Sequence, residues 1–278
     1  MDKLHGGIIL PKKFTGTAAN LNKIVKYYQF PVFYERELKL WEENPIYDGV
    51  PLKIFLYHNR LMYLGKNPKQ LSDLEIMRGF KIAGILRGYT VFNIKGMSEV
   101  LEKYNVKSVY DPCAGWGERM LCCIYHDVKY EGTDINAKLM DGYDQMMSQY
   151  DVHKICAVEL GDAASIDLTN ISADTVFTCP PYHDVEIYSP DGAENLSYKD
   201  FLVWWDSVVK NSLNVNPERF VFQINQKYKY DMLDIVLNNG FILQEEIALK
   251  KQSSHFTREK NGVNKKSEYE SVLVCRRV

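Results

Sequence analysis

Short strand-like runs alternate with amphipathic helical segments over the C-terminal two-thirds of the 278-residue chain. This alternation is typical of a parallel sheet covered by helices, and it predicts the α/β fold class. The predicted strands are Lys107–Asp111, Lys129–Asp134, Lys154–Leu160, Asp174–Cys179, Arg219–Ile224, Phe241–Leu249 and Glu270–Arg276. The predicted helices between them are Glu118–His126, Ala137–Tyr150, Tyr198–Leu213 and Tyr230–Asn238. The last two strands have no helix between them, which predicts an antiparallel pair at the end of the sheet.

The first hundred residues have a different character, with dense tyrosines and weak strand signals. A helix is predicted at Met97–Tyr104, just before the first strand. We therefore expect two domains: a mostly helical extension over residues 1–95 and the sheet domain over residues 96–278.

The charges are nearly balanced, because 34 Lys and Arg residues stand against 36 Asp and Glu residues, for a formal net charge of −2. A global basic field is excluded, so any nucleic-acid contact must come from a local patch. The six cysteines include no C-x-x-C spacing, which argues against a disulfide framework or a zinc site and favours reduced thiols in the cytoplasm. No apolar run is long enough for a signal peptide or a membrane span, so no membrane contact is expected.

A glycine-rich turn follows the first predicted strand, in the sequence DPCAGWGERML from Asp111 to Leu121. Glycines let the backbone approach a ligand closely, and the N-terminus of the following helix offers free N–H groups. Acids end the next two strands: Asp134 in GTDIN, at the spacing where a carboxylate accepts hydrogen bonds from ribose, and Asp162 in GDA. All three segments lie at the carboxyl ends of strands, where open α/β sheets bind ligands.

Two prolines and a tyrosine follow the predicted strand DTVF, in the sequence TCPPYHDVEIYS from Thr178 to Ser189. Proline cannot donate a hydrogen bond to a neighbouring strand, so the strand is expected to end there. A plain turn would explain these residues. A rigid corner that holds a carbonyl, a small side chain and an aromatic ring around one flat substrate group would explain them as well.

The segments DPCAGWG, GTDIN, GDA and TCPPY, in this order, resemble the motifs of Rossmann-like S-adenosylmethionine-dependent methyltransferases. More narrowly, the set is similar to the amino-methyltransferases with a [D/N/S]PP[Y/F/W] motif, which include DNA adenine-N6 and cytosine-N4 enzymes. The resemblance covers about the C-terminal two-thirds of the chain. It implies a seven-stranded, mostly parallel sheet with an antiparallel last strand, and S-adenosylmethionine as the cofactor.

The resemblance also implies a role for each motif position. An upstream segment, Tyr89–Asn93, would close over the methionine end of the cofactor. The positions that would cradle the methionine part are Asp111, Ala114, Gly115 and Gly117. The other cofactor positions are Asp134 and Ile135 at the ribose and adenine, Asp162 and Ala163 at the adenine edge, and Cys179.

The catalytic positions implied are Cys179, Pro180, Pro181 and Tyr182. An exocyclic base amine is a poor nucleophile, because its lone pair is delocalised into the ring. Acceptors that draw its hydrogens out of the ring plane, here the Pro180 carbonyl and residue 179, activate the amine without a strong base. Tyr182 would stack on the base, an interaction worth about 1–3 kcal/mol. A base in a duplex must first be flipped out.

Cys179 departs from the family pattern, because Asp, Asn or Ser is usual before the prolines and a thiol is a weak acceptor. Three explanations are open. Pro180 carries most of the activation, or the substrate is not the usual base amine. In the third explanation, Cys179 is a nucleophile that forms a covalent adduct for methylation of a pyrimidine carbon.

Two segments after the motif supply predicted substrate contacts. His183, expected at the surface, and Tyr188 lie in the polar loop HDVEIYSPDGAENLSY, and the basic segment Lys250–Lys266 combines cations with an aromatic ring. Such a segment suits phosphate contact and base stacking, although a solvated hairpin would have the same composition. Its predicted binding residues are Lys250, Lys251, His255, Phe256, Arg258 and Lys260. Further along, Trp204 and Trp205 are expected to pack within a helix.

The function predicted from these features is methylation of a base amine in duplex or single-stranded DNA, with adenine N6 placed before cytosine N4 on family frequency alone. A methyltransferase acting on RNA base amines is the alternative within the same chemistry. A protein-glutamine methyltransferase would share the Pro-Pro-Tyr geometry but usually has Asn before it. The rival of another class is a catalytically impaired methyltransferase-fold binding protein, against which the intact glycines and acids argue. The oligomeric state and the recognition sequence are left open.

Overall fold

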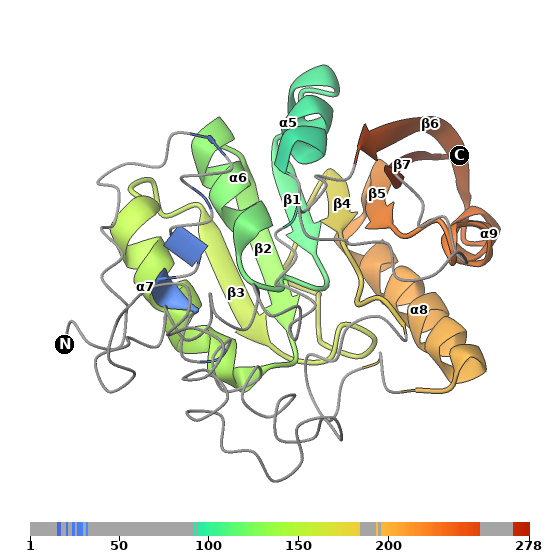
Figure 1. The fold of residues 1–278 in the computed structure, drawn as a ribbon, viewed down its shortest axis with the longest axis horizontal. Helices are drawn as coiled ribbons and strands as arrows, with labels where there is room; N and C mark the ends of the chain where they lie inside the picture. The colour runs from blue at the N-terminus through green and yellow to red at the C-terminus, as the bar shows by residue number, and fades with distance from the viewer. Residues whose placement is uncertain are drawn as a thin grey trace, which may run out of the picture.

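A single sheet organises the part of the chain that the computed structural model describes. The described residues are 16, 17, 21, 24, 25, 27–29, 32, 92, 94–183, 193, 196–250 and 269–278. Within these residues seven strands are arranged in the order β3-β2-β1-β4-β5-β7-β6 (Figure 1). The strands are β1 Ser108–Asp111, β2 Lys129–Asp134, β3 Cys156–Leu160, β4 Thr175–Thr178, β5 Arg219–Ile224, β6 Phe241–Lys250 and β7 Tyr269–Arg277.

The sheet is parallel from β3 to β5 and antiparallel at its other end. Strand β1 pairs in parallel with both β2 and β4, and β4 pairs in parallel with β5. Strand β7 lies between β5 and β6 and runs antiparallel to both. The predicted fold class, with its antiparallel final strand, is confirmed.

Five α-helices are described over their full length, in addition to helical residues between positions 21 and 32. They are α5 Ile94–Lys103, α6 Glu118–His126, α7 Met140–Tyr150, α8 Tyr198–Ser212 and α9 Lys229–Asn238, with 3₁₀ turns at Ala137–Leu139 and Leu213–Val215. Helix α5 begins earlier than predicted, so the predicted boundary between residues 95 and 96 falls inside its first turn. The division into two domains stays a prediction, because residues 33–91 lie outside the described residues.

The sheet has a hydrophobic core on each face, because successive side chains of a strand point to opposite faces. Val109 and Phe177 belong to the core shared with α5, α6 and α7. Their neighbours Tyr110 and Val176 belong to the core shared with α8 and α9. The helices therefore cover both faces and leave the ends of the strands as the places where loops gather (Figure 1).

Local reasons explain two of the differences between the observed and the predicted strand ends. Strand β4 ends at Thr178 rather than at Cys179, because Pro180 has no N–H to extend the ladder. Strand β3 begins at Cys156 rather than at Lys154, which has a left-handed φ of 54°. No helix among the described residues is long and apolar enough to cross a membrane.

Candidate functional site

The glycine turn and the diproline corner meet at the point where the strand order reverses. Strand β1 has β2 on one side and β4 on the other. Ligands of open α/β sheets bind outside the carboxyl ends of the strands at such a switch point. Asp111 ends β1 and begins DPCAGWG, whereas Thr178 ends β4 and begins TCPPY. The structure thus brings the two predicted motifs to one place on the sheet edge.

The turn after β1 depends on its glycines. Gly115 and Gly117 have φ values of 64° and 95°, a region that residues with side chains rarely adopt. A Cβ on Gly117 would also lie 2.8 Å from the Met146 side chain. The Ala114 N–H donates to the Thr133 carbonyl at 2.8 Å, which ties the turn to β2. The backbone is therefore held close to the sheet edge, with α6 starting directly behind it.

Asp134 lies at the end of β2, beside this turn. Its Oδ2 accepts from the Gly115 N–H at 2.8 Å, and its Oδ1 accepts from the Asn136 N–H at 2.9 Å. Burial raises the pKa of Asp134 to about 6, although the two backbone donors act in the opposite direction. The Tyr143 hydroxyl also donates to Oδ2, at 3.5 Å, whereas Oδ1 has no second donor among the described residues and can accept another hydrogen bond. Additional hydroxyl donors would therefore stabilise the ionised form, which suits a ribose.

Two further positions fit a flat ring next to that acid. Ile135 leaves 45% of its surface exposed, an apolar side chain directly after the Asp134 carboxylate. Asp162 accepts from the Ala164 N–H at 3.0 Å and from the Trp204 indole N–H at 3.3 Å, both at Oδ1. Its Oδ2 accepts no hydrogen bond from the described residues, so it remains available to an amine. Ala163 is buried behind it.

Asp111 is held inside the protein by an ion pair that the sequence did not reveal. The Arg119 Nε donates to Asp111 Oδ2 at 2.6 Å, and the Tyr130 hydroxyl donates to the same oxygen at 2.8 Å. Arg119 also donates to the Cys113 carbonyl and lies over the Phe92 ring, 4.9 Å from its centroid. Burial favours the neutral form of Arg119, but the Asp111 carboxylate raises its pKa above the usual value. This cluster holds the glycine turn from within.

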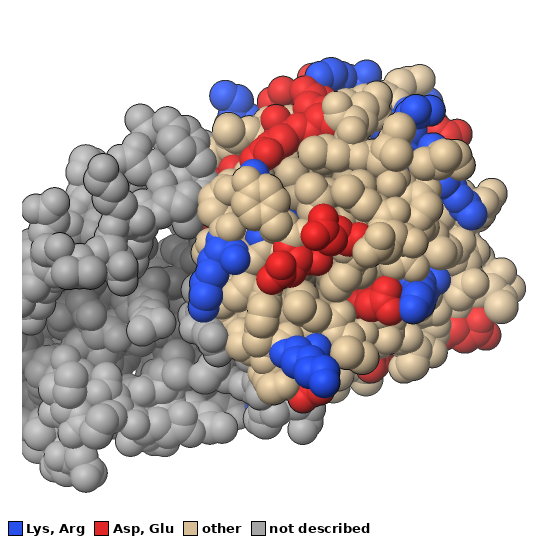
Figure 2. Space-filling view, turned by 90° about the vertical axis from the view of Figure 1, so that its right-hand side faces the viewer, with Lys and Arg blue, Asp and Glu red and all other residues tan. Residues whose placement is uncertain are grey.

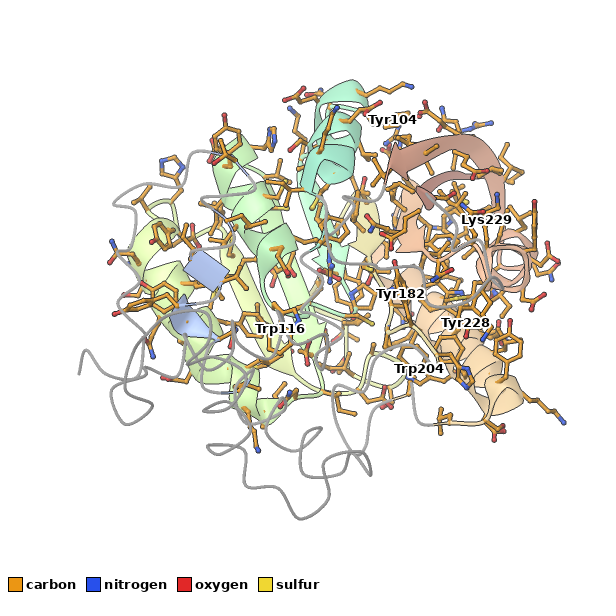
Figure 3. All side chains as sticks on the ribbon, in the orientation of Figure 1. Tyr104, Trp116, Tyr182, Trp204, Tyr228 and Lys229 are labelled. Carbon is orange, nitrogen blue, oxygen red and sulfur yellow. The ribbon has the colours of Figure 1, made fainter. Side chains whose placement is uncertain are left out.

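The diproline corner begins on a half-buried cysteine. Cys179 packs against the core clusters of both sheet faces, and its Sγ lies 3.8 Å from the Tyr182 hydroxyl. Pro180 is buried and Pro181 is half-buried. Tyr182 is only 8% exposed and packs in the core on the α8 side of the sheet, where Figure 3 also shows Trp204 and Tyr228. Stacking by Tyr182 stays a prediction, and it requires that the ring become accessible to a base.

The expected surface position of His183 is wrong. His183 is 6% exposed, and its ring packs against Phe201 with the two centroids 5.4 Å apart. The Tyr228 hydroxyl donates to the His183 carbonyl at 2.6 Å. Aromatic rings from α8 and from the loop before α9 cover this histidine, an arrangement that depends on contacts between distant parts of the chain. The substrate contact assigned to it stays a prediction.

The other predicted substrate residues cannot be placed. Tyr188, Lys251, His255, Phe256, Arg258 and Lys260 lie outside the described residues, and of Lys250 the structure describes the backbone at the end of β6. Figure 2 shows the face that carries β6 and α9, where described residues of both charges are interspersed. The described part of this face therefore forms no continuous basic surface, and the predicted phosphate contact depends on the Lys250–Lys266 sequence.

Comparisons with known proteins give structural neighbours but no family. No protein-family model matches the chain, and no curated protein matches it. Magnesium protoporphyrin IX methyltransferase (ChlM) from Synechocystis PCC 6803, solved with bound SAM, is 14% identical, with a TM-score of 0.47 over 83% of this chain and 99% of that chain. TrmN from Thermus thermophilus is 16% identical, with a TM-score of 0.47 over 73% of this chain and 53% of that chain. At these identities and scores the similarities assign neither a substrate nor a mechanism to this protein.

Proposed function

We propose that this chain is an S-adenosylmethionine-dependent methyltransferase that acts on an exocyclic amine of a nucleobase in DNA, with adenine N6 as the favoured position. The observation that carries the proposal is the meeting of the glycine turn and the diproline corner at the carboxyl ends of β1 and β4. A methyl donor on one of these segments and an acceptor amine on the other would lie face to face. Such positioning supplies much of the catalysis in a transfer that needs no strong base.

The residues around the turn fit the proposed cofactor. Asp134 would accept hydrogen bonds from the ribose, Ile135 would flank the adenine, and Asp162 Oδ2 would accept from the adenine amine. The backbone at Gly115 would approach the methionine part. When bound there, S-adenosylmethionine supplies an electrophilic methyl group on a sulfonium. The residues of the chain bind and orient it.

The diproline corner would hold the amine. The backbone of a proline pair is stiff, so the direction of the Pro180 carbonyl is fixed before the substrate arrives, which is electrostatic preorganisation. An acceptor in that position polarises an N–H and frees the nitrogen lone pair. The choice of DNA rests on the resemblance of TCPPY to the amino-methyltransferase motif and on the basic segment Lys250–Lys266.

Methyl transfer from a tritiated donor tests the proposal directly. The purified chain is incubated separately with duplex DNA, single-stranded DNA, total RNA and a protein lysate, and the label in each polymer is counted. We expect label in DNA, with methyladenine as the modified base after digestion. Label in RNA alone would show that the substrate is RNA rather than DNA, and label in protein alone would refute nucleobase methylation.

Calorimetry with S-adenosylhomocysteine, the product form of the cofactor, separates the enzyme from a binding protein. Binding together with methyl transfer supports the proposal. No binding by a folded protein with Asp134 intact would favour the catalytically impaired fold.

A further inference from the structure

The residue of β5 that continues the register toward Cys179 is a glutamine. Strands β4 and β5 pair in parallel with Thr178 opposite Phe222, so the next residues along the two strands are Cys179 and Gln223. Val221, two residues before Gln223, belongs to the same core cluster as Phe177, two residues before Cys179. By strand alternation the Gln223 side chain lies on that face as well, against which Cys179 also packs.

Gln223 carries a carbonyl oxygen whose hydrogen-bonding capacity is unused. The side chain is 3% exposed, and its Oε1 is a buried atom with no hydrogen-bond partner among the residues that the structure describes. Leaving a buried acceptor unsatisfied costs about 1–3 kcal/mol. Such atoms are rare in folded proteins, and each one calls for a reason.

The orientation of the Gln223 amide is set by a carboxylate. Its Nε2 donates to Glu270 Oε2 at 2.7 Å. An ionised carboxylate can only accept, so the nitrogen must face Glu270 and the oxygen must face away from it. The acceptor is thus fixed in direction before any ligand binds.

We propose that Gln223 Oε1 is the second acceptor for the substrate amine, in the place of the Asp, Asn or Ser side chain that position 179 lacks. This inference rests on the proposed function. The Pro180 carbonyl accepts a hydrogen bond from one N–H of the amine, and the Gln223 amide oxygen accepts one from the other N–H. The small Cys179 side chain leaves room for the amine between these two acceptors. The amine nitrogen forms the new N–C bond as the S–C bond of the donor breaks with its electron pair on sulfur, and the amine then loses one proton to water.

The decisive variants are Gln223→Met, which replaces the amide by an apolar group of similar length, and the double variant Gln223→Met with Cys179→Asn. We measure single-turnover transfer of tritiated methyl to random-sequence single-stranded DNA, S-adenosylhomocysteine binding by calorimetry, and the melting temperature. Gln223→Met is expected to slow transfer about 100-fold, the order of effect when one preorganised polar group is removed from such a site. Cofactor binding is expected to stay within twofold of the wild type. The double variant is expected to transfer methyl at least tenfold faster than Gln223→Met alone, because Cys179→Asn returns an acceptor to the diproline corner.

Thr175→Val is the matched control. Thr175 Oγ1 is also a buried atom without a partner among the described residues, but it lies at the opposite end of β4. Its removal is expected to leave the transfer rate unchanged.

The outcomes separate the two proposals. A wild type that labels no nucleic acid overturns the proposed function and the acceptor role together. A wild type that labels DNA, beside a folded Gln223→Met variant that is within threefold of its rate, overturns the acceptor role alone. A slow Gln223→Met variant that Cys179→Asn does not rescue shows a structural part for Gln223 and overturns the acceptor role as well.

Discussion

The Arg119 guanidinium and the Asp111 carboxylate form a buried ion pair, with Nε and Oδ2 2.6 Å apart, directly beneath the glycine turn. The two residues come from different elements, since Asp111 ends β1 and Arg119 lies in the first turn of α6. The ion pair therefore joins the two ends of the glycine turn. The Tyr130 hydroxyl completes the pair by donating to the same carboxylate oxygen.

Replacing Arg119 by Met is expected to destabilise the protein by about 3–5 kcal/mol, because it leaves the Asp111 charge buried without its cation. Urea unfolding followed by circular dichroism measures the change in the free energy of unfolding. Lys210→Met is the control, since Lys210 and Asp206 form an exposed pair on α8. Its loss is expected to cost at most about 1 kcal/mol. Equal effects of the two substitutions would contradict a structural role for the buried pair.

Asp134 is expected to make cofactor binding depend on pH. Hydroxyl donors bind the ionised carboxylate more strongly than the neutral acid, and burial raises the pKa of Asp134 to about 6 in the free protein. The affinity for S-adenosylhomocysteine is therefore expected to fall as the pH drops below about 6, and bound ligand lowers the pKa. In the free protein, the contribution of Asp134 to the free energy of unfolding changes with pH in the opposite direction. The Asp134 contribution is present at low pH and is lost as the pH rises from about 4 to 6, because the folded state holds the proton longer.

The Asp134→Asn variant tests both statements. It is expected to weaken S-adenosylhomocysteine binding about 10- to 100-fold at pH 7.5 and to flatten the pH dependence, as calorimetry across pH 5–8 would show. Asp144→Asn, at an exposed position on α7, is the control and should change neither. If the Asp134→Asn protein binds S-adenosylhomocysteine as tightly as the wild type, Asp134 does not bind the ribose.

The adjacent tryptophans of α8 are expected to have different functions. The Trp204 indole N–H donates to Asp162 Oδ1, whereas the Trp205 indole N–H donates to the Met232 carbonyl inside the core. Trp204→Phe should weaken S-adenosylhomocysteine binding about 3- to 10-fold, the range for one hydrogen bond, with little change in stability. Trp205→Phe should lower the melting temperature and leave binding unchanged. The same shift in affinity from both variants would exclude a specific link between Trp204 and the cofactor site.

The strands, the helices and the position of the site could be predicted because they follow from local patterns. Apolar runs separated by amphipathic segments fix the order of elements, and the glycines and prolines mark where strands end. The partners inside the site could not be predicted in this way. His183 stands in a polar stretch of sequence, and only the packing of α8 and the α9 entry buries it.

Arg119 and Gln223 illustrate the same limit. A basic residue in the first turn of a helix opposes the helix dipole, so Arg119 carried a weak signal that it has another partner. Gln223 carried none, because a glutamine within an apolar strand becomes informative only when its neighbour in the sheet is known. Pairings between strands depend on the whole fold rather than on residues close in sequence.

The basic segment Lys250–Lys266 is expected to give DNA binding a strong dependence on salt. Each phosphate contact by a Lys or Arg releases condensed counterions, so the slope of log affinity against log salt reports their number. Replacing Lys251 and Lys260 by Gln is expected to reduce this slope by about 1 for each phosphate that is no longer bound, as fluorescence anisotropy with single-stranded DNA would show. Lys129→Gln, at the exposed start of β2, is the control. A slope near zero in the wild type would refute phosphate contacts altogether.

Cys179 distinguishes hydrogen bonding from covalent catalysis at the corner. If the thiol contributes at most a weak hydrogen bond, Cys179→Ser is expected to keep or increase the rate of methyl transfer, because a hydroxyl is a better acceptor of similar size. If the thiol is a nucleophile, the same change should abolish transfer while S-adenosylhomocysteine still binds. The geometry favours the first outcome, because Cys179 is half-buried between two hydrophobic cores. Single-turnover transfer and calorimetry on the same preparation decide the matter, and loss of transfer with intact binding would replace amine activation by an adduct mechanism.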